Sequence, residues 1–224
     1  MDQIFVVIPA FNEGKVIGDV VTSVRVHFPN VVVVDDGSSD DTIAMARNAG
    51  AVVVPHPFNL GQGAALQTGL SYVLQNGADY IVTFDADGQH DIQDVPKMLE
   101  ALKLKQVDIV LGSRFLGSTQ KLPPLRRLVL KMAVIFTKIT AGLQLTDTHN
   151  GLRVLSRHAA QSIRIRQDSM ADASELLDQI GQMKLKYVEA PVHVIYSEYS
   201  LAKGQKLTGA FAILADLFYG RISR

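Results

Sequence analysis

Short apolar runs alternate with amphipathic segments through the first half of the chain. The apolar runs predict strands at residues 4–8, 31–34, 51–54, 80–84 and 108–111. After the first run, apolar residues recur three or four positions apart, which predicts a helix whose buried face holds Ile17, Val20, Val21, Val24 and Phe28. A second helix is expected over 40–48, after the capping residues Ser38 and Ser39 and before Gly50.

This alternation predicts a fold of the α/β class. Strands that are apolar throughout are typical of a mostly parallel, Rossmann-like sheet covered by helices on both faces. Ligands of such sheets bind beyond the carboxyl ends of the strands. The residues that directly follow each strand are therefore the candidates for function.

The second half of the chain is less regular. Helices are expected over 125–143 and 173–183, and a strand is expected over 187–195. A final helix is predicted over 206–222. No repeat, low-complexity tract or linker interrupts the chain, so we expect a single domain over residues 1–224.

Charge is distributed unevenly along a chain whose net charge is zero. The half at about 1–113 carries 14 acidic and 6 basic residues and can hold a cation. In the half at about 114–224, the stretch 114–166 carries 10 basic residues and the single acid Asp147, and this stretch can meet anions. Uneven charge on solvated faces would give the same counts.

The absence of cysteine limits the metal chemistry. Without cysteine neither a disulfide framework nor a thiolate site can form, so a divalent ion would need oxygen or imidazole ligands, which favours Mg²⁺ or Mn²⁺. Nucleic-acid binding is not expected, because the net charge is zero and the basic run is not interleaved with aromatic residues.

The segment 84–90, Phe-Asp-Ala-Asp-Gly-Gln-His, ends the strand predicted at 80–84. Side chains two positions apart in an extended segment point the same way, so Asp85 and Asp87 can face one cation, with Gln89 as a further oxygen ligand. A cation held there would neutralise a diphosphate and assist its departure as a leaving group. An Asx-type turn, in which the carboxylates accept backbone N–H groups, would give the same pattern.

Two further segments lie at the ends of predicted strands. Asp35 and Asp36 end the second strand, where one carboxylate can accept from a nucleobase N–H while the other holds the loop. After the first strand, Phe11 can stack on a base, and Glu13 stands in the first turn of a helix. A simple turn and helix start would explain both segments equally well.

These three segments, in this order, resemble the signature of family 2 glycosyltransferases of the GT-A fold: Pro-Ala-Phe-Asn-Glu, Val-Asp-Asp-Gly-Ser-Ser-Asp and Asp-x-Asp. The segments 59–65, 85–90 and 112–115 are more closely similar to the dolichyl-phosphate mannose synthase branch, whose members glycosylate polyprenyl phosphates. The similarity covers about residues 3–155. It implies a GT-A fold and a metal-dependent hexosyltransferase with Mg²⁺ or Mn²⁺ as its cofactor.

The resemblance also implies roles for individual residues. The nucleoside pocket would be lined by Pro9, Ala10, Phe11, Glu13, Asp36, Gly63, Asp85 and Ala86. The metal ion and the donor diphosphate would be held by Asp85, Asp87 and Gln89. The catalytic residues near the phosphates would be Asp87, Arg114 and Arg153. The segment 196–206 departs from this branch because it lacks the expected arginine, and Lys203 or Lys206 would take the place of that arginine near the phosphates.

The implied reaction moves a sugar, with inversion, from a UDP- or GDP-sugar to a polyprenyl phosphate. A lipid phosphate is already an anionic nucleophile and needs no general base, whereas a hydroxyl acceptor would need one, for which Asp172 or Glu175 is available. Two alternatives stay open: transfer to a saccharide hydroxyl in cell-envelope polysaccharide synthesis, and a non-catalytic nucleotide-sugar-binding scaffold of a membrane complex.

The chain start lacks the pattern of a secretory leader, which predicts a cytoplasmic protein. No segment is a convincing membrane span, because 128–143 contains Lys131 and Lys138 and is shorter than about 20 apolar residues. The helix predicted over 206–222 has an apolar face flanked by basic residues, which suits either a membrane surface or packing on the core. We therefore expect peripheral attachment at the inner face of the membrane, through this helix or a separate membrane protein partner; homo-oligomerisation stays open.

Overall fold

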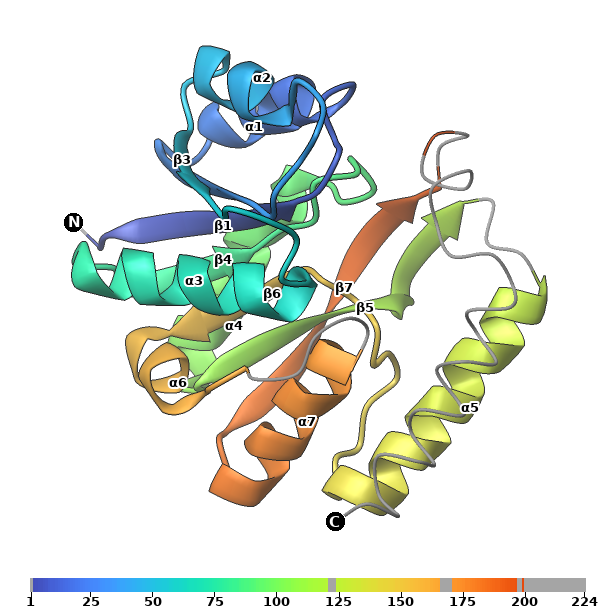
Figure 1. Ribbon diagram of the computed structural model, residues 1–224. Helices are drawn as coiled ribbons and strands as arrows, with labels where there is room; N and C mark the ends of the chain where they lie inside the picture. Colours follow the sequence, from blue (N-terminus) through green and yellow to red (C-terminus); the bar gives the residue numbers. More distant parts are fainter. Residues whose placement is uncertain (1, 121–123, 166–170, 197–198, 200–224) are drawn as a thin grey trace.

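In the computed structural model, which describes residues 2–120, 124–165, 171–196 and 199, seven strands form one central sheet (Figure 1). Along the sheet the strands follow the order β3-β2-β1-β4-β6-β5-β7. Their bounds are Ile4–Ala10 (β1), Asn30–Asp35 (β2), Val52–Pro55 (β3), Tyr80–Thr83 (β4), Ile109–Gln120 (β5), Arg153–Ser156 (β6) and Tyr187–Ile195 (β7).

The prediction of a mostly parallel sheet is confirmed. Strands β1 to β4 run parallel, and the apolar runs of β1, β2 and β4 are buried by helices on both sides. The sequence pattern did not reveal β6, which lies antiparallel between β4 and β5. Strand β5 is longer than the predicted 108–111 and pairs in parallel with β7 on both sides of an irregularity between Ser113 and Ser118.

Helices cover both faces of the sheet, as predicted. One face packs against α1 (Ile17–Arg25), α2 (Thr42–Asn48) and α4 (Val95–Lys105), which follows the short 3₁₀ helix η1 (Ile92–Asp94). The other face packs against α3 (Gln62–Gln75), α6 (Arg157–Ser162) and α7 (Ala171–Met183). Side chains alternate along each strand, so Val6 and Ile8 of β1 join the first of these cores and Val7 joins the second.

Helix α5 (Pro124–Ala141) contacts α7 and lies along the outside of the molecule (Figure 1). Gly181 of α7 permits the contact, because a Cβ there would lie 2.3 Å from the carbonyl oxygen of Ala141. No helix in the described part of the chain is both long and apolar enough to cross a membrane. The helix predicted over 206–222 lies outside the described residues, and the single domain over 1–224 stays a prediction.

Candidate active site

Strands β1, β2 and β4 end at one cavity of about 360 Å³, a volume in the range of small-molecule sites. Parallel strands present their carboxyl ends at the same edge of a sheet, which brings the segments that follow them together. The wall is formed by Pro9, Ala10, Phe11, Glu13, Asp36, Asn59, Gly61, Gln62, Ala65, Asp85, Ala86 and Asp87. The cavity thus gathers residues of all three segments that the sequence singled out, whereas Gly63 and Gln89 are not part of this wall.

Side chains of the loop between β2 and α2 hold the turn that follows β1. Asn12, at φ 54°, donates its N–H to Ser38 Oγ at 2.8 Å, and its Oδ1 accepts from the N–H of Ser39 at 2.9 Å. The N–H of Glu13 donates to Thr42 Oγ1 at 2.8 Å. The prediction that Ser38 and Ser39 cap the second helix is therefore wrong: α2 begins later, at Thr42, and both serines bind the turn that places Glu13 on the cavity wall.

Asp36 is buried and holds the loop that precedes α3. Its Oδ1 accepts from the N–H of Leu60 at 2.9 Å, and its Oδ2 accepts from the N–H of Gly61 at 2.8 Å. Nδ1 of His56 lies 2.8 Å from Asp36 Oδ1, and Nε2 of His56 lies 2.9 Å from Thr68 Oγ1. His56 was not found from the sequence, where it is a single histidine with no motif around it. Contact of Asp36 with a nucleobase stays a prediction.

The N-terminus of α3 reaches the cavity through Gly61, Gln62 and Ala65. Gly61 precedes the helix at φ 95°, a conformation that glycine adopts without strain. A helix N-terminus has free N–H groups and partial positive charge, which favours anions such as phosphates. Gly63, predicted to contact the nucleotide, lies in the first turn of this helix and is buried.

Asp85 is held between a histidine and a glycine. Nε2 of His90 lies 2.8 Å from Asp85 Oδ2. A Cβ on Gly151 would lie 2.1 Å from Asp85 Oδ1, so the backbone before β6 lies directly against the carboxylate. Burial would raise the pKa of Asp85, but the interaction and hydrogen bond with His90, together with the positive charges of Arg153 and Arg114, hold the pKa below its usual value. Arg114 and Arg153, which the sequence analysis predicted to lie near the phosphates, therefore act on this carboxylate.

Asp87 carries an unfavourable charge in the folded protein. Burial, together with the negative charge of Asp85, raises the pKa of Asp87 to about 6. The backbone N–H of Gln89 donates to Asp87 Oδ1 at 3.0 Å, and Nε2 of Gln89 donates to Oδ2 at 2.6 Å. Gln89 thus orients Asp87 through donated hydrogen bonds, and its role as a metal ligand stays a prediction.

The substitution Asp87→Asn is expected to raise the Tm of the metal-free protein at pH 8 by about 2–4 °C. The folded-state pKa near 6 exceeds the ordinary value of 3.8. The stabilising contribution of the protonated carboxyl is therefore fully present below about pH 4 and is lost as the pH rises through about 6. Asparagine carries no charge at any pH, so the difference in Tm should vanish at low pH. Thermal melts in EDTA across this range check the prediction, and a pH-independent difference would contradict it.

The acidic pair suits a hard divalent cation. Mg²⁺ is typically bound through one or two carboxylates together with phosphate oxygens of a substrate. Asp85 and Asp87 supply two carboxylates on one wall, and a cation would relieve the repulsion that raises the pKa of Asp87. Among the described residues, no group of three or more His, Cys, Asp or Glu side chains gathers as a metal site.

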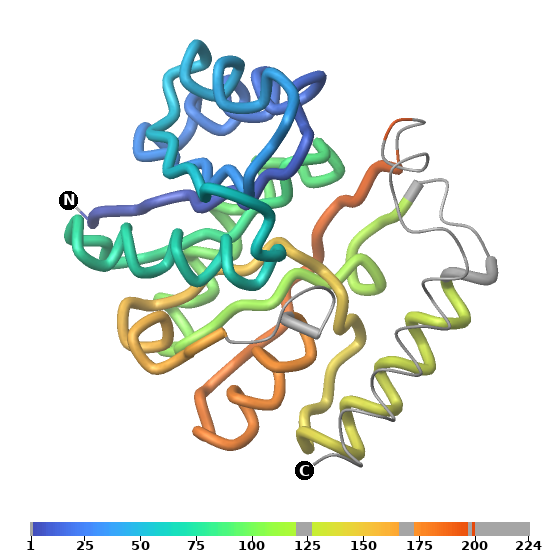
Figure 2. Tube along the Cα trace, in the orientation of Figure 1, coloured from blue at the N-terminus to red at the C-terminus, as the bar shows by residue number. Residues whose placement is uncertain are grey.

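Arg114 belongs to a buried hydrogen-bond network. Its Nε donates to Asp147 Oδ2 at 2.6 Å, and its Nη1 donates to the Tyr196 hydroxyl at 2.6 Å. Its Nη2 donates to the carbonyl of His149. Figure 2 traces the segment that carries Asp147 and His149, in yellow, from the end of α5 towards β6. Arg114 therefore joins β5, this segment and the end of β7, a structural role that the sequence did not reveal.

Arg153, the first residue of β6, is also buried. Its Nε donates to the carbonyl of Asn150 at 3.1 Å, which fixes the turn that presents Gly151 to Asp85. Because the guanidinium lowers the pKa of Asp85, its positive charge acts at the cavity. Arg153 is not part of the cavity wall, so the anion contact expected from the sequence stays a prediction.

Tyr199, beyond β7, contacts a residue of the cavity wall. The hydroxyl of Tyr199 donates to Glu13 Oε2 at 2.8 Å, and burial together with this bond raises the pKa of Tyr199. The N–H of Ile195 donates to the carbonyl of Gln89 at 3.0 Å, so the end of β7 also supports the acidic segment. Lys203, Lys206 and the side chain of Asp172 lie outside the described residues, and Glu175 of α7 is not part of the cavity wall.

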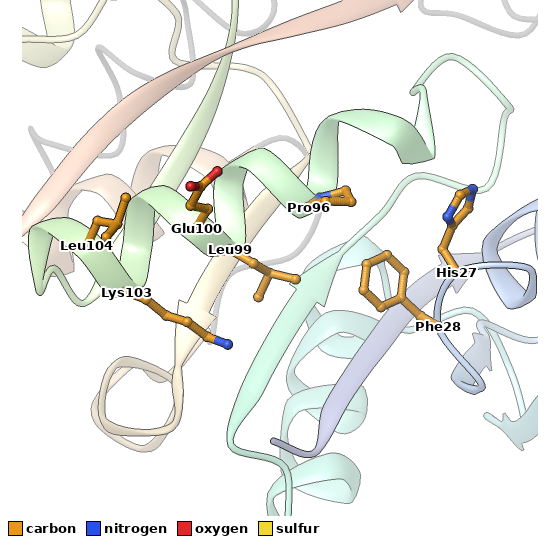
Figure 3. A pocket seen from close by; sticks show the side chains of 7 residues that line it. All are labelled: His27, Phe28, Pro96, Leu99, Glu100, Lys103 and Leu104. Atoms are coloured by element: carbon orange, nitrogen blue, oxygen red, sulfur yellow. The ribbon is translucent and has the colours of Figure 1, made fainter. Parts of the chain in front are cut away.

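A second hollow, of about 470 Å³, lies between the end of α1 and one side of α4 (Figure 3). Its lining is mostly apolar and shares no residue with the first cavity. The residues that form it are His27, Phe28, Pro96, Leu99, Glu100, Lys103 and Leu104. Its wall contains one carboxylate, that of Glu100, and Pro96 from the first turn of α4. This hollow therefore lacks the pair of carboxylates that lines the first cavity.

Comparisons with known proteins point in the same direction as the geometry. A sequence model described as Glycosyl transferase family 2 matches residues 5–164. An uncharacterized protein of Methanocaldococcus jannaschii is 37% identical, over 99% of this chain and 93% of its own length. The UDP-N-acetylglucosamine–dolichyl-phosphate N-acetylglucosaminyltransferase of Methanococcus voltae is 34% identical, over 96% of this chain and 94% of its own length. The solved structure of glucosyl-3-phosphoglycerate synthase from Mycobacterium tuberculosis with Mn²⁺, UDP and glucosyl-3-phosphoglycerate has a TM-score of 0.74 at 21% identity, over 99% of this chain and 79% of that one.

Proposed function

Because the chain belongs to glycosyltransferase family 2 and has the GT-A fold, we propose that it transfers a sugar from a UDP- or GDP-sugar to a polyprenyl phosphate, with inversion at the anomeric carbon. The cavity in which Asp85 and Asp87 lie with the N-terminus of α3 is the main support. Two carboxylates that suit a cation, beside a helix end that attracts phosphates, fit a nucleoside diphosphate. The relative from Methanococcus voltae, named for transfer to dolichyl phosphate, supports the acceptor class.

On the donor side, each group of the cavity has a physical task. Phe11, 42% exposed at the wall, offers a ring face on which a base can stack. Asp85 and Asp87 would hold Mg²⁺ or Mn²⁺, which supplies positive charge to the leaving diphosphate. His90 and the backbone of Gly151 keep the Asp85 carboxylate in one orientation, so little reorganisation is needed when the donor binds.

On the acceptor side, a phosphate monoester is already ionised and needs no general base. One of its oxygens forms a bond to the anomeric carbon while the bond from that carbon to the diphosphate oxygen breaks, and the electron pair leaves with the nucleoside diphosphate. Attack from the face opposite the leaving group inverts the configuration. The positive charges of Arg153 and Arg114, which act near Asp85, favour the approach of an anion.

The substitution Gly151→Ala is expected to weaken metal-dependent nucleotide binding by at least about tenfold, because groups that orient a metal ligand typically contribute that much. The added Cβ would overlap the Asp85 carboxylate, which would have to rotate away from His90. Titration calorimetry with UDP or GDP and Mn²⁺ measures the effect. Gly18→Ala is the matched control, since a Cβ there meets first the flexible end of Met45 at 3.3 Å. Equal affinities in the two variants would contradict the close packing of Gly151 on Asp85.

Two assays test the proposed function in sequence. A thermal-shift panel of UDP- and GDP-sugars, with Mn²⁺ and with EDTA, identifies the base and the metal requirement, because a ligand that binds the folded state raises the Tm. Release of nucleoside diphosphate is then followed with a short-chain polyprenyl phosphate and, separately, with soluble saccharides. We expect turnover with the lipid phosphate. Efficient glycosylation of a saccharide alone would assign a hydroxyl acceptor, and donor binding without turnover on any acceptor would favour a scaffold.

The same proposal places the protein peripherally at the cytoplasmic face of a membrane, because the prenyl chain of the acceptor lies in a bilayer. A separate membrane protein partner and homo-oligomerisation remain predictions. The contribution of residues 206–222 to attachment is also a prediction, since they lie outside the described residues.

A further inference from the structure

The outer side of α5 carries a continuous apolar stripe. Leu128, Met132, Ile135 and Ile139 are 56%, 46%, 61% and 75% exposed. At about 100° per residue, these side chains fall within an arc of about 60° on the helix. The opposite side of the helix is buried against the protein through Leu130, Ala133 and Thr137. Single exposed apolar residues are ordinary, but an aligned set on one helix marks an interaction surface.

A basic stripe runs beside the apolar one. Arg127, Lys131 and Lys138 are exposed and fall within the adjoining arc of about 40°. The sequence of α5 over 124–141 contains no acidic residue. A helix with large aliphatic side chains next to a row of cations has the composition of helices that lie in the interface of a negatively charged bilayer.

We propose that this α5 face (Arg127, Leu128, Lys131, Met132, Ile135, Lys138 and Ile139) docks on the surface of an anionic lipid bilayer. The inference rests on the proposed function, since a polyprenyl phosphate acceptor must be reached at a membrane. Charge complementarity favours lipid as the occupant: anionic headgroups match three cations with no acid among them, and the acyl boundary accepts the apolar stripe.

Vesicle flotation tests the α5 face directly. Wild-type protein is expected to bind phosphatidylcholine vesicles that contain phosphatidylglycerol and to bind pure phosphatidylcholine weakly. The double variant Ile135→Gln/Ile139→Gln should lower partitioning at least about tenfold. Lys131→Gln/Lys138→Gln should lower it about 30-fold on the anionic vesicles, which corresponds to about 1 kcal/mol for each lysine. The matched controls are Val26→Gln/Leu104→Gln, which replaces exposed aliphatic residues at the end of α1 and on α4, and Lys97→Gln/Lys105→Gln, which replaces exposed lysines of α4. Both should bind like wild type.

A fluorescent label reports what covers the face. Because the chain has no cysteine, Met132→Cys can be labelled with a polarity-sensitive dye at one site, and Leu104→Cys provides the control. The emission of the label at 132 should shift to the blue only when anionic vesicles are added. A blue-shifted label before vesicles are added would show that the face is covered by residues 200–224 or by a second copy, and light scattering would separate these two outcomes. Either outcome would overturn the proposal.

Failure of this inference can be told apart from failure of the proposed function. In a vesicle-free assay with a short-chain, water-soluble polyprenyl phosphate, Ile135→Gln/Ile139→Gln should keep wild-type turnover. Absence of turnover in the wild type would remove the proposed function, whatever the vesicles show. Turnover with unchanged vesicle binding in all α5 variants would overturn the docking face alone.

Discussion

Replacing Asp87 with alanine is expected to slow sugar transfer by about 10³-fold, the scale on which loss of one group that stabilises a developing charge acts. Asp87 is one of the two carboxylates of the acidic segment on the cavity wall, next to Asp85. Without it, the cation that neutralises the departing diphosphate loses a protein ligand. Release of nucleoside diphosphate at saturating donor and Mn²⁺, with a short-chain polyprenyl phosphate, measures the loss.

A loss of activity in this variant cannot be assigned to unfolding. Removal of Asp87 relieves its repulsion with Asp85, so the metal-free variant should melt at or above the wild-type Tm at pH 8. Asp41→Ala is the matched control. Asp41 is an exposed acid directly before α2, and its side chain makes no cap hydrogen bond to that helix. Wild-type turnover in Asp87→Ala would show that the acidic pair does not serve the leaving group.

The strands and helices that the sequence predicted are those with a strong local signal. The strands β1, β2 and β4 are short apolar runs because both faces of each strand are buried. Helix α1 shows a clear period of about 3.6 residues because only one of its faces is buried. β6 has four residues, of which Arg153 and Ser156 are polar, so it has no period to detect. The extension of β5 to Gln120 depends on pairing with β7, a contact between distant parts of the chain.

Prediction of the site met the same limit. The candidates Pro9, Phe11, Asp36 and Asp85 gather in the cavity because parallel strands end at one edge of a sheet, a rule that can be applied without coordinates. Gly151 lies against Asp85 through a close approach of two segments that are far apart in sequence. Acids of the site each accept or share one hydrogen bond with His56, His90 or Tyr199. Such a bond forms only in the folded structure and cannot be predicted from a local sequence pattern.

Arg114→Met is expected to lower the free energy of unfolding by about 3–5 kcal/mol, the usual cost of leaving one member of a buried ion pair alone. Asp147 would remain as an uncompensated charge, since its side chain is 0% exposed. The Tyr196 hydroxyl and the carbonyl of His149 would also lose their donor. Urea unfolding measures the change. The free energy of unfolding of Arg114→Lys should lie between those of Arg114→Met and the wild type. An ammonium group keeps the charge but cannot match the planar guanidinium that donates to three acceptors.

The double variant Arg114→Met/Asp147→Asn separates a structural role from a catalytic one. A neutral amide at position 147 is less costly to bury than a lone carboxylate, so the double variant should be more stable than Arg114→Met alone, and the two changes should not be additive. Sugar transfer should stay low in both variants if the guanidinium charge near Asp85 also serves the phosphates. If Arg114→Met instead unfolds like wild type and loses only activity, the ion pair contributes little to the fold, and the catalytic role inferred from the sequence becomes the better explanation of this residue.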